Sequence, residues 1–170
     1  MTYPLRQPPA EYLVDTEEDL SGLRTQVLRL VGQPVVRADR HYGDEVCVEV
    51  GEKRPYDSQL LGDEHQGSWQ MTTQGSEWSL RDAEGAVRCT SDDPTTIELA
   101  FEPVSGSSIT DALVTYPDLG LVIKFSNGWS FLVAGSEADD QDLHNWVMFD
   151  DAGGIILAGP GQRWFSGRAD

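Results

Sequence analysis

Two stretches of the sequence follow the same pattern. LHNWVMFDDAGGIILAGPGQRW spans Leu143 to Trp164, and QGSWQMTTQGSEWSLRDAEGAV spans Gln66 to Val87. They align without a gap, and a pattern that recurs at a fixed separation is typical of a fold that contains one structural unit twice. At this 77-residue offset the matched residues are Trp69 and Trp146, Met71 and Met148, Trp78 and Ile155, Leu80 and Leu157, and Val87 and Trp164.

Further upstream the two units match at slightly smaller offsets. At 75 residues, the triplet Val46, Val48 and Val50 falls on Leu121, Ile123 and Phe125; at 74 residues, Gly32, Val35 and Ala38 fall on Gly106, Ile109 and Ala112. Loop insertions in a duplicated fold would produce this drift, and chance similarity between two β-meanders is the alternative. We therefore predict a first β unit over residues 31–90, a connector over 91–103 and a second β unit over 104–166.

Alternation of apolar and polar residues identifies the strands of both units. The run VCVEV at residues 46–50 places Val46, Val48 and Val50 on one face, with Cys47 and Glu49 on the other. Asn127-Gly128 is the strongest hairpin signal, since a type I′ turn requires positive φ at both central positions. Residues 51–67 are predicted to be a polar loop, and IELAFEPV at 97–104 is predicted to be a further strand.

One helix is expected, near the N-terminus. Residues 1–14 contain three prolines and predict an extended arm. Residues 15–31 combine Asp15 or Thr16 as N-cap with apolar residues at helical spacing, and no matching helix is expected before the second unit. The predicted fold is α+β and mainly β: two tandem pseudo-repeated antiparallel β-meanders form one domain over residues 1–170, with the N-terminal helix packed on the sheet.

The chain is strongly acidic. Its 170 residues include 29 acidic and 12 basic side chains, which gives a formal charge of −17. This charge argues against nucleic acid and anionic membranes as partners, because their phosphates would be repelled. It fits either a solvated surface or a basic protein partner. The N-terminal sequence has no basic segment followed by an apolar one, so we expect a cytoplasmic protein in which Cys47 and Cys89 are buried free thiols.

The sequence shows no catalytic or cofactor motif. His41, His65 and His144 are not accompanied by a marked nucleophile, and hairpin turns explain the glycine-rich stretches AGPGQRW and DDAGG. A zinc site would need more ligands than two separate cysteines and three scattered histidines provide. We therefore expect a protein that is not an enzyme and that binds no cofactor and no metal.

The segment from Gly135 to Asp151 is the best candidate for a binding surface, because it contains six acidic residues and no Lys or Arg. Its acidic loop lacks the spacing of a calcium-binding EF-hand. Acidic side chains around an aromatic anchor are typical of protein-binding surfaces, since the aromatic ring supplies contact area and the charges speed association. Trp146 is either a core residue or part of this surface. The predicted partner-binding residues are Glu137, Asp139, Asp140, Asp142, Phe149, Asp150 and Asp151.

The second unit resembles a known kind of module. The segment Leu119–Trp164 is similar to the small β-meander modules of immunity proteins in bacterial (actinobacterial) polymorphic toxin systems. The hairpin IKFSNGWSF at Ile123–Phe131 is similar to their V-x-F-x-[ND]-G-x-x-[LF] pattern, with Ile123 in place of the valine, and the first unit lacks such a hairpin. The resemblance assigns no functional residue. It implies a partner: a cognate toxin enzyme, either a nuclease or an NAD-degrading or ADP-ribosylating enzyme, whose basic active-site cleft the immunity protein occludes.

Two other functions are compatible with the sequence. The chain could be a structural or interaction protein of an unknown pathway. It could also bind a small ligand in a pocket between the two β units, lined by Trp69, Trp78, Trp146 or Trp164, because ligands often bind at such boundaries. Monomer and homodimer are both consistent with the sequence.

Overall fold

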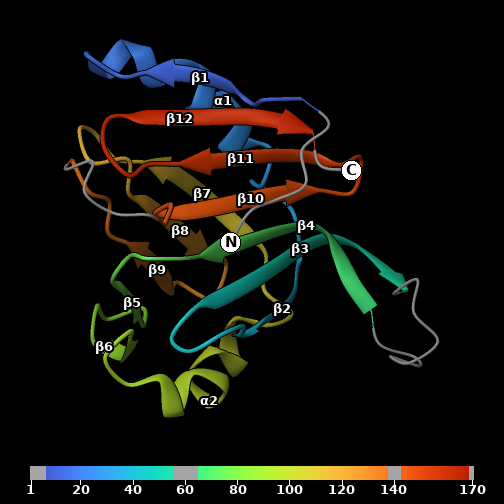
Figure 1. The fold of residues 1–170 in the computed structure, drawn as a ribbon. Helices are drawn as coiled ribbons and strands as arrows, with labels where there is room; N and C mark the ends of the chain where they lie inside the picture. The colour runs from blue at the N-terminus through green and yellow to red at the C-terminus, as the bar shows by residue number, and fades with distance from the viewer. Residues whose placement is uncertain (1–6, 56–64, 138–142, 169–170) are drawn as a thin grey trace.

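Two antiparallel sheets enclose a shared hydrophobic core in the computed structural model, which describes residues 7–55, 65–137 and 143–168. Figure 1 shows the seven-stranded sheet in front of the five-stranded sheet. The first has the order β1-β12-β11-β10-β4-β3-β2, with β1 (Ala10–Leu13), β2 (Val35–Arg40), β3 (Val46–Pro55), β4 (His65–Thr73), β10 (Trp146–Asp150), β11 (Gly154–Ala158) and β12 (Arg163–Arg168). The second has the order β6-β5-β9-β8-β7, with β5 (Trp78–Arg81), β6 (Val87–Thr90), β7 (Ile109–Val114), β8 (Leu121–Phe125) and β9 (Ser130–Val133).

The mainly β fold with an N-terminal helix is as the sequence predicts. The alternation in β3 is confirmed, because Val46, Val48 and Val50 all belong to the core between the sheets. Glu49 lies on the opposite face, where Arg37 of the neighbouring β2 donates a hydrogen bond of 2.9 Å to its carboxylate. A buried carboxylate is tolerated there because it is paired.

Several predicted boundaries need correction. The N-terminal helix is shorter than residues 15–31: it consists of a 3₁₀ turn, η1 (Glu17–Leu20), and α1 (Ser21–Leu28). The predicted arm contains β1, which pairs with β12 at the sheet edge. Part of the predicted polar loop at 51–67 is strand, since β3 continues to Pro55 and β4 begins at His65. Polar residues are accommodated there because this end of the hairpin is exposed.

The predicted strand at 97–104 is wrong. This segment forms α2 (Ile97–Phe101), preceded by the 3₁₀ turn η2 (Pro94–Thr96) and followed by η3 (Glu102–Val104). Ile97, Phe101 and Val104 recur at helical spacing, and all three are fully buried. Proline is accepted at the start of such a segment because the first N–H groups of a helix need no partner within it. The second unit therefore does have a helix before its first strand.

The contacts made by Gly32 and Gly106 have a local two-fold symmetry. The N–H of Gly32 donates to the carbonyl of Ile109 (2.8 Å), and the N–H of Gly106 donates to the carbonyl of Val35 (3.0 Å). Gly106 follows Gly32 by 74 residues, and Ile109 follows Val35 by the same number, so each contact is the other with its partners exchanged. Reciprocal contacts of this kind are the property of an isologous interface.

The helices obey the same relation. Leu23 and Val27 of α1 precede Ile97 and Phe101 of α2 by 74 residues, and all four side chains have no exposed surface. α1 packs against β7 and α2 packs against β2, so each helix covers the first strand of the other unit. The tandem duplication itself stays a prediction, but these contacts follow its 74-residue offset.

The residues matched at the 77-residue offset are not the ones that this symmetry relates. β4 and β10 are neighbours at the centre of one sheet, where Met71 lies opposite Met148. Their sequences are alike because both strands present the same face to the same core. The symmetry instead relates β4 to β9: Trp69 lies opposite Val50 in β3, and Trp129 hydrogen-bonds through its carbonyl to Phe125 in β8.

Candidate functional site

A groove of about 400 Å³ lies on the outer face of the five-stranded sheet. Its floor includes Val122 of β8 and Leu132 of β9, which lie directly opposite each other. Both alternate with buried residues of the core, so they point away from it. Leu113 of β7 lies opposite Val122 and is 46% exposed, which extends the apolar row beyond the groove. The sheet thus presents a partly exposed aliphatic row to solvent.

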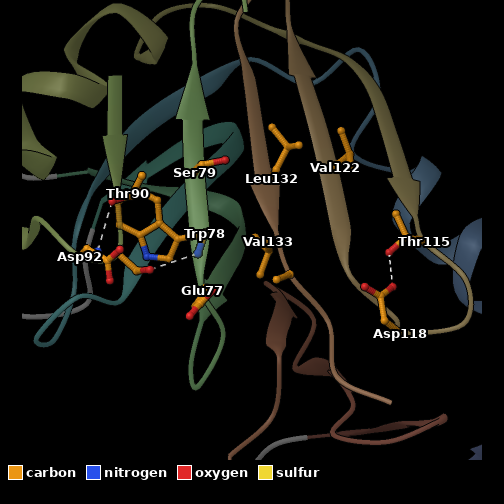
Figure 2. A pocket seen from close by; sticks show the side chains of 12 residues that line it. Glu77, Trp78, Ser79, Thr90, Asp92, Thr115, Asp118, Val122, Leu132 and Val133 are labelled. Atoms are coloured by element: carbon orange, nitrogen blue, oxygen red, sulfur yellow. Dashed lines mark hydrogen bonds between the residues drawn. The ribbon is translucent and has the colours of Figure 1, made fainter. Parts of the chain in front are cut away.

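Three carboxylates surround this floor. Figure 2 shows Glu77 and Asp92 on one side of the groove and Asp118 on the other, with Leu132 and Val133 between them. Glu77 precedes β5, Asp92 follows β6 and Asp118 lies in the turn between β7 and β8. The described lining residues are Glu77, Trp78, Ser79, Thr90, Ser91, Asp92, Thr115, Asp118, Val122, Leu132, Val133 and Ala134.

The Asp118 carboxylate is held in place by its own turn. Its Oδ1 accepts hydrogen bonds from the Thr115 hydroxyl (2.5 Å) and from the N–H of Gly120 (3.2 Å). The Asn145 side-chain amide donates to the Asp118 carbonyl (3.2 Å), which fixes the turn against the start of β10. An acceptor held in this way loses little conformational entropy when it meets a donor from a ligand.

The two acids on the other side are anchored through their backbones. The N–H of Ala134 donates to the carbonyl of Glu77 (2.8 Å), and the N–H of Asp92 donates to the hydroxyl of Thr90 (3.3 Å). Both side chains are exposed. Within the described lining there is no Lys, Arg, His or Cys, so the groove offers hydrogen-bond acceptors and negative charge around an apolar floor. This combination suits a ligand or side chain that carries a cationic group next to an apolar portion.

The four predicted partner-binding residues that the structure describes lie in two separate places. Asp139, Asp140 and Asp142 lie outside the described residues. Glu137 is exposed in the segment that follows β9, three residues beyond Ala134 of the groove. Phe149, Asp150 and Asp151 lie at the other end of β10, near the turn to β11.

Asp150 and Asp151 are engaged within the protein. Asp150 ends β10, and its Oδ1 accepts hydrogen bonds from the N–H groups of Ala152 (3.0 Å) and Gly154 (2.6 Å). A short carboxylate at the start of a turn satisfies the turn amides in this way. Asp151 forms an ion pair with Arg54 of β3. Phe149 packs beside the buried side chains of Val147, Ile155 and Leu157 on the outer face of the seven-stranded sheet.

Glu77, Asp92 and Asp118 are not predicted as site residues from the sequence. They are spread over three separate turns, and only the pairing of β5 with β6 and β9 and of β8 with β7 and β9 brings them to one groove. The available signal was the alternation of β8 and β9, which leaves Val122 and Leu132 on the face opposite the core. Acids in the turns that flank such strands are therefore candidate binding residues.

The tryptophans named for a pocket between the two units are mainly core residues. Trp146 has no exposed surface, and Trp78 and Trp164 are 4% and 5% exposed. All three belong to the hydrophobic cluster between the sheets, and Trp69 packs against it. Trp146 is therefore a core residue and not part of an exposed surface.

Comparisons of the chain with protein-family models, curated proteins and solved structures find no match. Among the residues that the structure describes, none of the helices has both the length and the apolar character needed to cross a membrane.

Proposed function

We propose that the chain is a non-catalytic binding protein that neutralises a basic toxin enzyme, as immunity proteins do, and that the acidic groove is its contact surface. The observation that carries the proposal is the convergence of the Glu77, Asp92 and Asp118 carboxylates around the exposed aliphatic floor. The second unit's resemblance to immunity-protein modules adds to it.

The groove combines the two contributions that a protein interface needs. The row formed by Leu113, Val122 and Leu132 supplies apolar area, which stabilises a complex by roughly 25 cal/mol for each Å² removed from water. The acidic rim, supported by the formal charge of −17, raises the rate of encounter with a basic partner. In this mechanism a Lys or Arg side chain of the toxin's cleft pairs with the fixed Asp118 carboxylate, and the sheet face then occludes the cleft.

A small cationic ligand is the second candidate. The volume of the groove, about 400 Å³, lies within the range of small-molecule sites, roughly 300–1,000 Å³. A compact ligand would use the same carboxylates and the same floor. The two candidates differ in the size of the partner and in the area they cover, and one experiment separates them.

That experiment is a pulldown from a lysate and secretome of the source organism, performed at low and high salt. The bait is the wild-type protein or the double variant Glu77→Gln with Asp92→Asn. The control bait is Glu18→Gln with Glu84→Gln, which removes the same charge from exposed positions away from the groove. The captured protein is then purified, and its enzymatic activity is measured with and without the wild-type chain.

The proposal expects one basic protein to be captured by the wild type and by the control variant at low salt, to be lost with the groove variant, and to lose its enzymatic activity when the chain is added. Equal capture by both double variants would place the contact elsewhere and contradict the groove. If no protein is captured at either salt concentration, the toxin-binding proposal is wrong, and a thermal-shift screen of small cations against the groove variant becomes the test of the second candidate.

A further inference from the structure

The local symmetry provides a comparison between two tryptophans in equivalent places. Trp69 of β4 lies opposite Val50, the N–H of Phe125 donates to the carbonyl of Trp129, and both tryptophans are half-buried against the core. In the first unit, the Arg29 guanidinium lies over the Trp69 ring, 4.4 Å from its centroid. Gln26 accepts a hydrogen bond from Arg29 (3.1 Å) and holds it there. Trp69 is thus covered by a cation from its own chain.

In the second unit the corresponding cation is missing from the sequence. Pro103 follows Arg29 by 74 residues, and Ala100 follows Gln26 by the same number. A cleft of about 520 Å³ opens at this place, lined by Trp129, Pro103 and Ala100 together with Leu99, which is 77% exposed. The guanidinium that covers the tryptophan in the first unit is replaced by open space in the second.

The cleft is preformed. The Asn127 side-chain amide donates to the carbonyl of Pro103 (3.0 Å), and its Oδ1 accepts from the N–H of Trp129 (3.0 Å). One asparagine therefore ties the hairpin that carries the tryptophan to the end of the helical segment. Arg88 also lines the cleft, but its Nε–H donates to the buried Asp82 carboxylate (2.6 Å), so its guanidinium is engaged in an ion pair.

We infer that this cleft receives an arginine side chain of a protein partner, stacked on Trp129 as Arg29 is stacked on Trp69. The inference rests on the proposed function in one respect only, namely that the partner is a basic protein. A planar guanidinium stacks on an indole face better than an ammonium group does, so arginine is favoured over lysine. The exposed Leu99 contacts the aliphatic part of the same side chain, and the charge of −17 favours any cation that approaches.

The test is a titration of ¹⁵N-labelled protein, in which each indole N–H gives its own signal and the Trp129 signal is assigned from a Trp129→Phe variant. The probes are a short peptide of alternating arginine and glycine and a peptide of alternating lysine and glycine with the same charge. We expect the shift of the Trp129 signal to be at least about threefold larger with the arginine peptide. A shift that is equal for the two peptides, or no shift at Trp129, overturns the inference.

Two variants make the comparison reciprocal. Pro103→Arg supplies the second unit with its own cation and is expected to abolish the Trp129 response. Arg29→Ala uncovers the tryptophan of the first unit and is expected to give Trp69 an arginine-selective response that the wild type lacks. A persistent Trp129 response in a folded Pro103→Arg variant contradicts the inference, as does a silent Trp69 in Arg29→Ala.

The outcome is separable from that of the proposed function. The groove variant Glu77→Gln with Asp92→Asn is expected to keep the arginine-selective response at Trp129, since the groove and the cleft share no lining residue. Capture of a toxin without this response would leave the groove proposal standing and remove the cleft. An arginine-selective response at Trp129 without capture of any protein would support the cleft and contradict the groove proposal.

Discussion

Trp78 and Trp146 make the same hydrogen bond from opposite sheets. Each is the first residue of its strand, β5 and β10 respectively. The Trp78 indole N–H donates to the carbonyl of Asp44 (2.7 Å) in the turn between β2 and β3, and the Trp146 indole N–H donates to the carbonyl of Leu119 (2.9 Å) in the turn between β7 and β8. Each sheet is therefore fastened to a hairpin turn of the other by one buried indole.

Replacing either tryptophan with phenylalanine should loosen the contact between the sheets. The substitution leaves a carbonyl without its donor, which costs about 1–3 kcal/mol, and the smaller ring adds a cavity term. We expect Trp146→Phe and Trp78→Phe each to lower the free energy of unfolding by at least this amount, measured by urea denaturation. Trp129→Phe, at a half-buried position, is the control and should cost less than about 1 kcal/mol; equal losses for all three variants would contradict the role of the indole hydrogen bonds.

The Asp82 carboxylate should contribute to the acid sensitivity of the fold. Burial alone would raise its pKa, but hydrogen bonds from the N–H of Ala86 and from the Arg88 side chain, together with the charge of Arg88, hold the pKa below its usual range. A carboxyl whose folded pKa is lowered stabilises the fold above its unfolded pKa, and this stabilisation is lost as pH falls through the folded pKa. We expect the destabilisation caused by Asp82→Asn to be largest at neutral pH and to shrink toward pH values below the usual range of aspartate.

This measurement needs the variant and not only the wild type. Burial raises the pKa of Asp39, so that carboxyl changes the stability in the opposite sense over the acid range. The difference between wild type and Asp82→Asn cancels the contribution of Asp39. A difference that is independent of pH would show that Asp82 acts through shape alone.

Gly135 should not tolerate a side chain. An ideal Cβ at this position would overlap the carbonyl of Asp118 and approach the N–H nitrogen of Gly120 to 2.6 Å. Because these are backbone atoms of the turn that holds the groove's carboxylate, Gly135→Ala should cost at least about 2 kcal/mol. Gly22→Ala is the matched control: its Cβ would meet Trp164 at 3.4 Å, an ordinary contact, and alanine should stabilise α1 by up to about 1 kcal/mol. We expect thermal unfolding to show a lower Tm for Gly135→Ala and an equal or higher Tm for Gly22→Ala. A Tm change in the same direction for both variants would contradict this prediction.

The two cysteines should be unreactive in the folded protein. Cys47 and Cys89 are buried free thiols, as the sequence predicts. Burial raises the pKa of Cys47 to about 12, so its reactive thiolate is scarce at neutral pH. A chromogenic disulfide reagent should label neither thiol in native buffer and both in concentrated guanidinium chloride. Rapid labelling of one thiol in native buffer would mean that the sheet bearing it opens locally.

The strands could be predicted from the sequence because their signals are local. Alternation in β3, β8 and β9 is set by the residues of each strand, and Asn127-Gly128 marks its own hairpin. The helical segment at 94–104 is not predicted from the sequence although Ile97, Phe101 and Val104 have helical spacing, because Ile and Phe also favour strands. The helical conformation of this segment depends on its packing against β2, a tertiary contact that cannot be inferred from the local sequence.

The groove could not be predicted for a related reason. Glu77, Asp92 and Asp118 are far apart along the chain, and the order in which strands pair decides whether their turns meet. The predicted partner-binding surface stays a prediction, but two of its carboxylates, Asp150 and Asp151, satisfy nearby donors. Charge counted along a segment does not reveal that Asp150 serves the turn that follows it.

The pairing of the first strand with the last gives the fold a mechanical property. Ala10 lies opposite Ser166 and Leu13 opposite Arg163, so the chain enters β1 and leaves β12 at the same end of their ladder. The hydrogen bonds of an antiparallel ladder run perpendicular to its strands, and a force that separates these two ends loads them one after another. The hydrogen bonds between β1 and β12 would therefore break one at a time at a small force. The central pairing of β4 with β10 would break only at a later stage of unfolding.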